Sequence, residues 1–197
     1  MTKQADRLQL RSGDIVFLAI PQLLYRCVAA ATGSPASHVG IAFEEAGGKW
    51  LVAESTIPVV TYTPLDDFLA KTDRGWVAVR RLKGGLGEEQ EGALRQACDL
   101  ELGKYYHQGF RYDSPRQFCS KFVYDAYRSA LGIEVGEIET FADLLARNPA
   151  GSKTFWRLWF FGFIPWHRKT VTPASLLRSE ALEPVSSPES RWEVPGT

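Results

Sequence analysis

The chain has 197 residues, which is enough for one domain with a substantial hydrophobic core. Its 23 lysines and arginines balance its 23 aspartates and glutamates, so the composition lacks the basic excess that is typical of nucleic-acid-binding proteins. The three cysteines, Cys27, Cys98 and Cys119, form neither an even-numbered disulfide framework nor a zinc-binding spacing, and they fit a reducing compartment.

The sequence predicts one domain over residues 1–182. From position 183 onwards Pro, Ser and Glu dominate, so we expect residues 183–197 to be a disordered tail. The first residues contain no apolar stretch of the kind that a signal peptide carries, and we therefore expect a cytoplasmic protein.

In chain order, the first predicted elements are a buried strand at 15–20 and a helix over 21–32, which begins at a proline and ends before a glycine. Residues 38–45 and 49–55 predict a β-hairpin, because each segment has a strand-like pattern and Gly47-Gly48 separates them. A short helix near 64–70 and a strand at 76–82 follow.

The second half of the chain is predicted to be mainly helical. A helix is expected over 88–102, and another around Cys119 that ends at Gly132. Thr172 and Pro173 predict the start of a short last helix, since Thr is a good N-cap and Pro suits the first helical position.

The hairpin could bring His38 close to Glu54. If paired positions sum to 92, the two residues face each other; if they sum to 94, they are diagonal neighbours on the same face. An odd sum would place Ser55 beside His38 instead, and apolar residues on both faces of 49–55 leave the register open. In either even register Glu54 can accept a ring N–H of His38, which selects the tautomer and supports an imidazolium.

Cys119 is the candidate nucleophile and His38 its candidate base. Cys27 and Cys98 lie on the apolar stripes of their helices, as small core residues do. Cys119 lies near the N-terminal end of a helix, where the partial positive charge favours a thiolate. Two alternatives stay open: Cys119 could pack in the core, or the helix could start at Ser114-Pro115 and leave Cys119 more than one turn inside.

Four segments together resemble a known family, the permuted papain-like amidases of the YiiX/YaeF type, which are circularly permuted relatives of NlpC-type cell-wall peptidases. The segments are RSGDIVF at 11–17, SHVGIAF at 37–43, Glu54, and QFCSKFVYDAY at 117–127. GKYY at 103–106 is similar to a Gly-x-Tyr-Asp stretch of that family, and VTPASL at 171–176 is similar to a C-terminal Thr/Tyr-Pro-x-x-Leu element.

The resemblance implies an α+β protein with a circularly permuted papain-like (NlpC-like) fold, in which an antiparallel sheet is packed on helices. It implies that Cys119 is the nucleophile, that His38 is the base and that Glu54 orients His38, which requires an even hairpin register. It also implies that the backbone N–H of Cys119 binds the oxyanion. No metal or organic cofactor is implied.

Three positions refine this comparison. Tyr105 matches the family's tyrosine, so it is either a substrate-binding residue or a buried core tyrosine. Tyr106 stands where the family has Asp, and Lys121 stands where the residue after Cys-Ser is usually acidic. We interpret His107 as a surface or hydrogen-bonded loop residue and His167 as exposed, and no two histidines have a metal-ligand spacing.

The predicted activity is thiol-dependent hydrolysis of an amide bond through a Cys acyl-enzyme, with a small-molecule, peptide or acyl-amide substrate. One alternative is an acyltransferase or lipid esterase of the lecithin:retinol acyltransferase type, and another is a papain-like fold that only binds. Neither the substrate nor an oligomeric state follows from the sequence.

The aromatic segment Phe155–Trp166 has two interpretations. It is too short to span a bilayer, which takes about 20 apolar residues. It could cover the core or form a subunit contact. Alternatively, its aromatic side chains and the basic residues that follow could rest on a membrane surface or contact an acyl chain.

Overall fold

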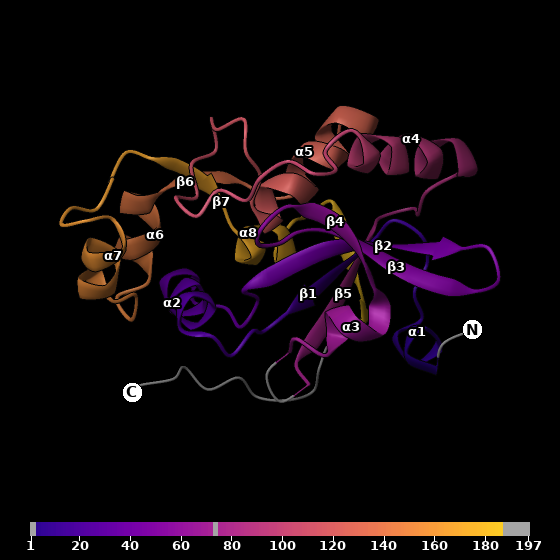
Figure 1. Ribbon diagram of the computed structural model, residues 1–197, viewed down its shortest axis with the longest axis horizontal. Coiled ribbons are helices and arrows are strands. Elements are labelled where there is room, and N and C mark those ends of the chain that lie inside the picture. The colour runs from indigo at the N-terminus through magenta and orange to yellow at the C-terminus, as the bar shows by residue number, and fades with distance from the viewer. Residues whose placement is uncertain (1–2, 73–74, 187–197) are drawn as a thin grey trace.

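The computed structural model of the chain describes residues 3–72 and 75–186. A six-stranded antiparallel sheet in the order β4-β3-β2-β1-β5-β8 forms its centre (Figure 1). The strands are β1 (Asp14–Leu18), β2 (His38–Glu45), β3 (Lys49–Ser55), β4 (Val60–Pro64), β5 (Val77–Leu82) and β8 (Leu182–Ser186). The α+β class with an antiparallel sheet packed on helices is confirmed.

The helices and a small second sheet complete the described chain. The helices are α1 (Lys3–Leu8), α2 (Leu23–Thr32), α3 (Leu65–Leu69), α4 (Glu88–Asp99), α5 (Cys119–Leu131), α6 (Phe141–Arg147), α7 (Lys153–Trp159) and α8 (Pro173–Leu177). Strands β6 (Ile138–Thr140) and β7 (Lys169–Val171) pair antiparallel. The five predicted helices are confirmed, although α4 ends three residues earlier than expected.

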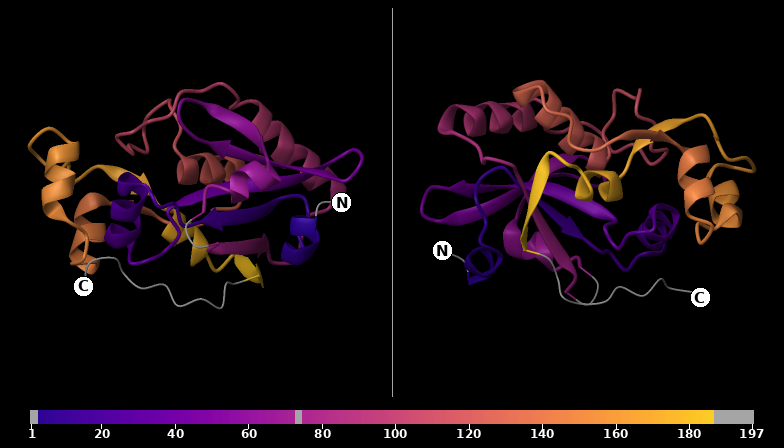
Figure 2. Two further views of the ribbon diagram at one scale, coloured as in Figure 1. Left: turned by 60° about the horizontal axis from the view of Figure 1, so that its bottom comes forward. Right: turned by 180° about the vertical axis from the view of Figure 1, so that it is seen from behind.

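Each face of the main sheet packs on its own hydrophobic core. Helices α4 and α5 lie side by side on one face (Figures 1 and 2), where Phe122 belongs to the same buried cluster as Val39 and Ile41 of β2. On the other face α1 and α3 cover a second cluster, to which Phe68 and Ala42 belong. Strand β2 is therefore buried on both faces, and its alternate side chains serve two different cores.

Helices α2, α6 and α7 gather at one end of the molecule, beyond the end of β2 that carries His38 (Figures 1 and 2). The aromatic segment lies in α7 and the loop that follows. Trp156, Phe160 and Ile164 of this segment are buried in the main core, so one half of the segment covers the core. The other half is exposed.

The predicted tail boundary at residue 183 is wrong. Residues 183–186 continue β8, which pairs with β5 at the edge of the sheet. Pro184 is tolerated there because an edge strand does not need every backbone N–H for pairing, and the register shifts at this point. Residues 187–197 lie outside the described residues. Within the part that is described, no helix combines the length and the apolar composition that crossing a membrane demands.

Candidate active site

The register of the β2–β3 hairpin decides where His38 and Glu54 meet. Ile41 pairs with Ala53, so paired positions sum to 94, and an even register is confirmed. Gly40 is then opposite Glu54, with His38 as the diagonal neighbour. A Cβ at Gly40 would lie only 2.5 Å from a side-chain carbon of Val52 and 3.3 Å from Cβ of Glu54. The glycine leaves the space across which Glu54 reaches His38.

The side chains of His38 and Glu54 are both fully buried and in contact. Nε2 of His38 lies 2.5 Å from Oε2 of Glu54. The imidazole is held between the rings of Tyr25 and Phe68, with centroid distances of 5.8 and 5.6 Å. Nδ1 has no hydrogen-bond partner among the described residues. The Glu54 contact thus leaves Nδ1 as the nitrogen that is available for proton transfer.

Glu54 is held at its second oxygen as well. Thr63 on β4 donates a hydrogen bond to Oε1 at 2.5 Å, and the ammonium of Lys71, just after α3, forms an ion pair with the same oxygen. Burial alone would raise the pKa of Glu54, but His38 and Lys71 outweigh it and lower the pKa to about 2. The carboxylate is therefore charged throughout the neutral range.

Cys119 is the first residue of α5, so the open question about the start of this helix is settled. Phe118 precedes it as the N-cap in an extended conformation, with φ −140° and ψ 161°. The first backbone N–H groups of a helix have no partner within it, and they give this end its partial positive charge. The Cys119 side chain therefore lies at the end of the helix that carries this charge.

The other two cysteines have different surroundings. Cys98 is fully buried on α4 and Cys27 is half-buried on α2, and both pack on the main core as predicted. Burial raises the pKa of both thiols. Neither lies at the start of a helix, so both are poor nucleophiles at neutral pH.

Cys119 and Glu54 together raise the pKa of His38. Burial would lower the pKa of His38, but the interactions with the Cys119 thiol and the Glu54 carboxylate outweigh burial and raise it to about 9. A charged imidazole beside Cys119 is the expected partner of a thiolate. The structure thus brings together the three residues that were predicted from the sequence, drawn from β2, β3 and α5.

The buried-core alternative for Tyr105 is wrong, and its neighbour Tyr106 is the tyrosine that lines the pocket beside Cys119. Tyr105 is 66% exposed, so it is neither a core tyrosine nor one of the residues that line the pocket beside Cys119. Tyr106 is buried and lines that pocket. Burial and the Cys119 thiol raise the pKa of Tyr106 well above its ordinary value, while the backbone N–H of Cys119 acts in the opposite direction. Its hydroxyl therefore stays protonated next to Cys119.

Backbone pairing explains why Tyr106 points inward. Tyr105 bridges to Val59 and Tyr106 bridges to Gln117, so consecutive side chains point to opposite sides. Gln117 in turn is bonded to Glu101 at 2.7 Å and to the ammonium of Lys121 at 3.3 Å. Lys121, which replaces an expected acidic residue, thereby supports the segment that carries Tyr106.

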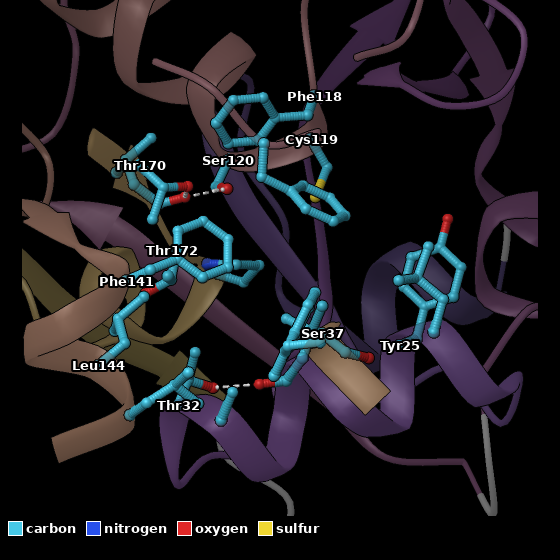
Figure 3. A pocket seen from close by; sticks show the side chains of 18 of the residues that line it. Tyr25, Thr32, Ser37, Phe118, Cys119, Ser120, Phe141, Leu144, Thr170 and Thr172 are labelled. Atoms are coloured by element: carbon cyan, nitrogen blue, oxygen red, sulfur yellow. Dashed lines mark hydrogen bonds between the residues drawn. The ribbon is translucent and has the colours of Figure 1, made fainter. Parts of the chain in front are cut away.

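A narrow apolar pocket opens beside Cys119 (Figure 3). Its cavity volume is about 40 Å³, and its walls come from α2, α5, α6, α7 and β7 together with Tyr106 and Phe110. The hydroxyls of Thr32 and Ser120 donate to backbone carbonyls of Val28 and Val171 at 3.0 and 2.8 Å. Because these hydroxyls are already bonded, the pocket favours a slim apolar group over a polar one.

The two remaining histidines behave as predicted. Nδ1 of His107 accepts a hydrogen bond from the backbone N–H of Gly109 at 2.9 Å, which is the expected role of a loop residue. His167 is exposed. Neither belongs to the group around Cys119.

Comparison with known proteins relates the chain to one family and one solved structure. A family model described as "Permuted papain-like amidase enzyme, YaeF/YiiX, C92 family" matches residues 9–186. The uncharacterized protein YiiX of Escherichia coli K12 is 35% identical over 141 residues, which are 72% of this chain and 69% of that protein. The crystal structure of YiiX from Escherichia coli O157:H7 superimposes with a TM-score of 0.84 at 31% identity, over 91% of this chain and 98% of the other.

YiiX is described as a metalloprotein in that crystal structure, which raises the question of whether this chain could hold a metal ion. Over residues 3–72 and 75–186, no three His, Cys, Asp or Glu side chains are grouped so that they could hold an ion. Both oxygens of Glu54 and Nε2 of His38 are already engaged in the contacts described above. The side chains around Cys119 therefore do not fit a metal-binding site.

Proposed function

Because the chain belongs to the permuted papain-like amidases of the YaeF/YiiX (C92) family, we propose that it cleaves an amide bond through an acyl-enzyme formed on Cys119. The observation that carries the proposal is the buried contact between His38 and Glu54 beside a cysteine that begins a helix. A domain that only binds would not need a carboxylate to orient a buried imidazole.

The first half of the reaction forms the acyl-enzyme. Nδ1 of His38 takes the proton of the Cys119 thiol, and Sγ attacks the substrate carbonyl carbon to form a C–S bond. The carbonyl oxygen becomes an oxyanion beside the backbone N–H of Cys119 and the hydroxyl of Tyr106. The C–N bond then breaks as the imidazolium of His38 gives its proton to the departing amine.

The second half releases the acid. A water molecule gives a proton to Nδ1 of His38 and attacks the thioester carbonyl, and the C–S bond breaks. The thiolate leaves and takes the proton back from Nδ1 of His38, the carboxylic acid dissociates, and the resting site is restored. Glu54 stays ionised throughout and holds Nε2 of His38, which keeps the ring in one tautomer.

The pocket supports an apolar acyl group on the carbonyl side of the scissile bond. It begins at Cys119 and offers mainly apolar surface from Leu24, Val28 and Trp156. A slim chain fits this shape better than a charged peptide side chain does. We therefore infer an N-acylated amine as the substrate class.

A set of fluorogenic N-acyl anilides of increasing chain length tests this proposal. We expect cleavage by the wild type to improve as the chain lengthens, and we expect Val28→Trp, which fills the pocket, to reverse that preference. Cleavage of peptide anilides in place of acyl anilides would contradict the substrate class. Absence of any thioester intermediate by mass spectrometry would contradict the mechanism itself.

One observation favours a second candidate function, acyl transfer. Cys119 is only 4% exposed and its pocket is apolar, so water has limited access to an acyl group bound there. An amine acceptor added to the assay would then capture the acyl group. A product ratio that shifts to the N-acyl amine at low acceptor concentration would support transfer, while release of free acid alone would support hydrolysis.

A further inference from the structure

The outer side of α7 and of the loop after it carries an exposed apolar surface, which we call the aromatic tip. Its members are Leu158 (76% exposed), Phe161 (96%), Phe163 (66%) and Trp166 (38%). Phe161 has a φ of 56°, a conformation that costs energy in a residue with a side chain. The chain therefore holds a large ring in solvent at an energetic cost, although its neighbours Trp156 and Phe160 are buried.

The aromatic tip is tied to the loop at 108–109. Trp159 donates its indole N–H to the carbonyl of Gln108 at 3.0 Å, and Arg168 donates to the carbonyl of Gly109 at 2.8 Å. The Arg168 guanidinium also lies over the ring of Phe160 at 5.0 Å. These segments line a groove of about 570 Å³. The tip is thus a built surface, held by side-chain contacts from α7 and the loop after it to the loop at 108–109.

Positively charged residues are concentrated in the segments around the tip, and one of them, Arg147, is paired with Glu139. From residue 144 to residue 179 the chain has six lysines and arginines and no aspartate or glutamate. Arg111 and Arg116, on the loop that follows Gly109, lie close enough to act electrostatically on His107, and Arg111 also acts on Arg168. None of the ion pairs found in the described residues involves Arg111, Arg116, Arg157, Arg168 or Lys169.

We propose that the aromatic tip docks on the surface of an anionic phospholipid membrane. Large apolar side chains enter the boundary between headgroups and acyl chains, while surrounding lysines and arginines meet the phosphates. The charge pattern selects this partner, because a second copy of the chain would bring the same uncompensated cations together.

The position of the tip links docking to the active site. Trp156 lines the pocket beside Cys119 and stacks on Phe160, which lines the groove, with a centroid distance of 5.9 Å. Docking would bring the pocket close to substrates whose acyl chains lie in the membrane. This link rests on the proposed function, whereas docking itself does not.

Co-sedimentation with vesicles tests the docking. The full chain is mixed with vesicles of phosphatidylcholine alone or of equal parts phosphatidylcholine and phosphatidylglycerol, at low and high salt. We expect binding to the mixed vesicles that weakens in high salt. Phe161→Ser combined with Phe163→Ser should weaken it by about tenfold or more. The matched control, Leu100→Ser combined with Leu102→Ser, removes two exposed leucines elsewhere and should bind as the wild type does.

A charge-reversal pair completes the design. Arg157→Glu with Lys169→Glu should weaken binding to the mixed vesicles, whereas Lys49→Glu with Lys83→Glu, at exposed sites on other elements, should have less effect. Equal losses in the aromatic and control variants would overturn the proposal. The proposal would also be overturned if the wild type were a dimer and Phe161→Ser dissociated it, because a second copy of the chain would then cover the tip. Cys119→Ala should bind vesicles as the wild type does. Vesicle binding can therefore be judged even if the proposed reaction fails.

Discussion

His38 and Glu54 are diagonal neighbours across the β2–β3 hairpin, and Nε2 of His38 still lies 2.5 Å from Oε2 of Glu54. The residue directly opposite Glu54 is Gly40, which has no side chain to block the contact. The carboxylate can therefore reach along the strand to the imidazole. The proposed chemistry depends on this pair, because it fixes which ring nitrogen can exchange a proton with Cys119.

The first prediction concerns stability in alkaline solution. The pKa of His38 in the folded protein, about 9, is above its ordinary value of 6.5, so charged His38 contributes stability that is present below pH 6.5 and lost as pH rises through about 9. The melting temperature of the wild type should fall across this window more steeply than that of His38→Gln. In Cys119→Ala the window should move to lower pH. The same dependence of melting temperature on pH in all three proteins would contradict this account.

The second prediction concerns Lys71. The pKa of Glu54 is about 2, below its ordinary 4.5, so its stabilising contribution is present above pH 4.5 and lost as pH falls through about 2. Lys71→Met removes one cause of that lowered pKa, so Glu54 should take up a proton at higher pH and activity should fail at a less acidic pH. Lys71→Arg should restore the wild-type profile. Lys104→Met, which breaks an exposed pair with Glu101, serves as the control and should leave the profile unchanged.

The third prediction separates the two adjacent tyrosines. Tyr106→Phe removes a hydroxyl beside Cys119 and should lower kcat by about a hundredfold to a thousandfold, because one oxyanion donor is lost. Alkylation of Cys119, which forms no oxyanion, should change far less. Tyr105→Phe should leave both rates unchanged, since that side chain is exposed. Equal effects of the two substitutions on kcat would rule out the role given to Tyr106.

Local sequence patterns predicted the elements that carry the candidate site, but not how side chains pair across them. The His38–Glu45 strand and a helix around Cys119 follow from local signals, but these signals left the start of that helix open between Ser114-Pro115 and Cys119. The hairpin register does not follow from them, because Lys49–Ser55 has apolar residues on both faces and several pairings bury comparable surface. The resemblance to a family supplied the even register, which pairing of Ile41 with Ala53 then confirmed.

The sequence-based predictions differ from the structure where contacts with distant segments determine how a residue is placed. Tyr105 and Tyr106 differ by one position, and only the bridges to Val59 and Gln117 determine which ring points inward. The segment at 183–186 looks disordered by composition, yet β5 offers it an open sheet edge that accepts Pro184. In the aromatic segment the buried Trp156, Phe160 and Ile164 recur at every fourth position, a helical spacing that the exposed Phe161 and Phe163 do not share.

The most direct test of the central claim is pH-dependent alkylation with an iodoacetamide probe, followed by peptide mapping, on the wild type, Cys119→Ala and His38→Ala. We predict that Cys119 is the fastest-labelled cysteine between about pH 5 and pH 9, and that loss of His38 slows its labelling near neutral pH by about tenfold or more. Cys119→Ala should abolish the rapid reaction. Labelling mainly at Cys27 or Cys98, or labelling of Cys119 that is indifferent to the loss of His38, would contradict the account.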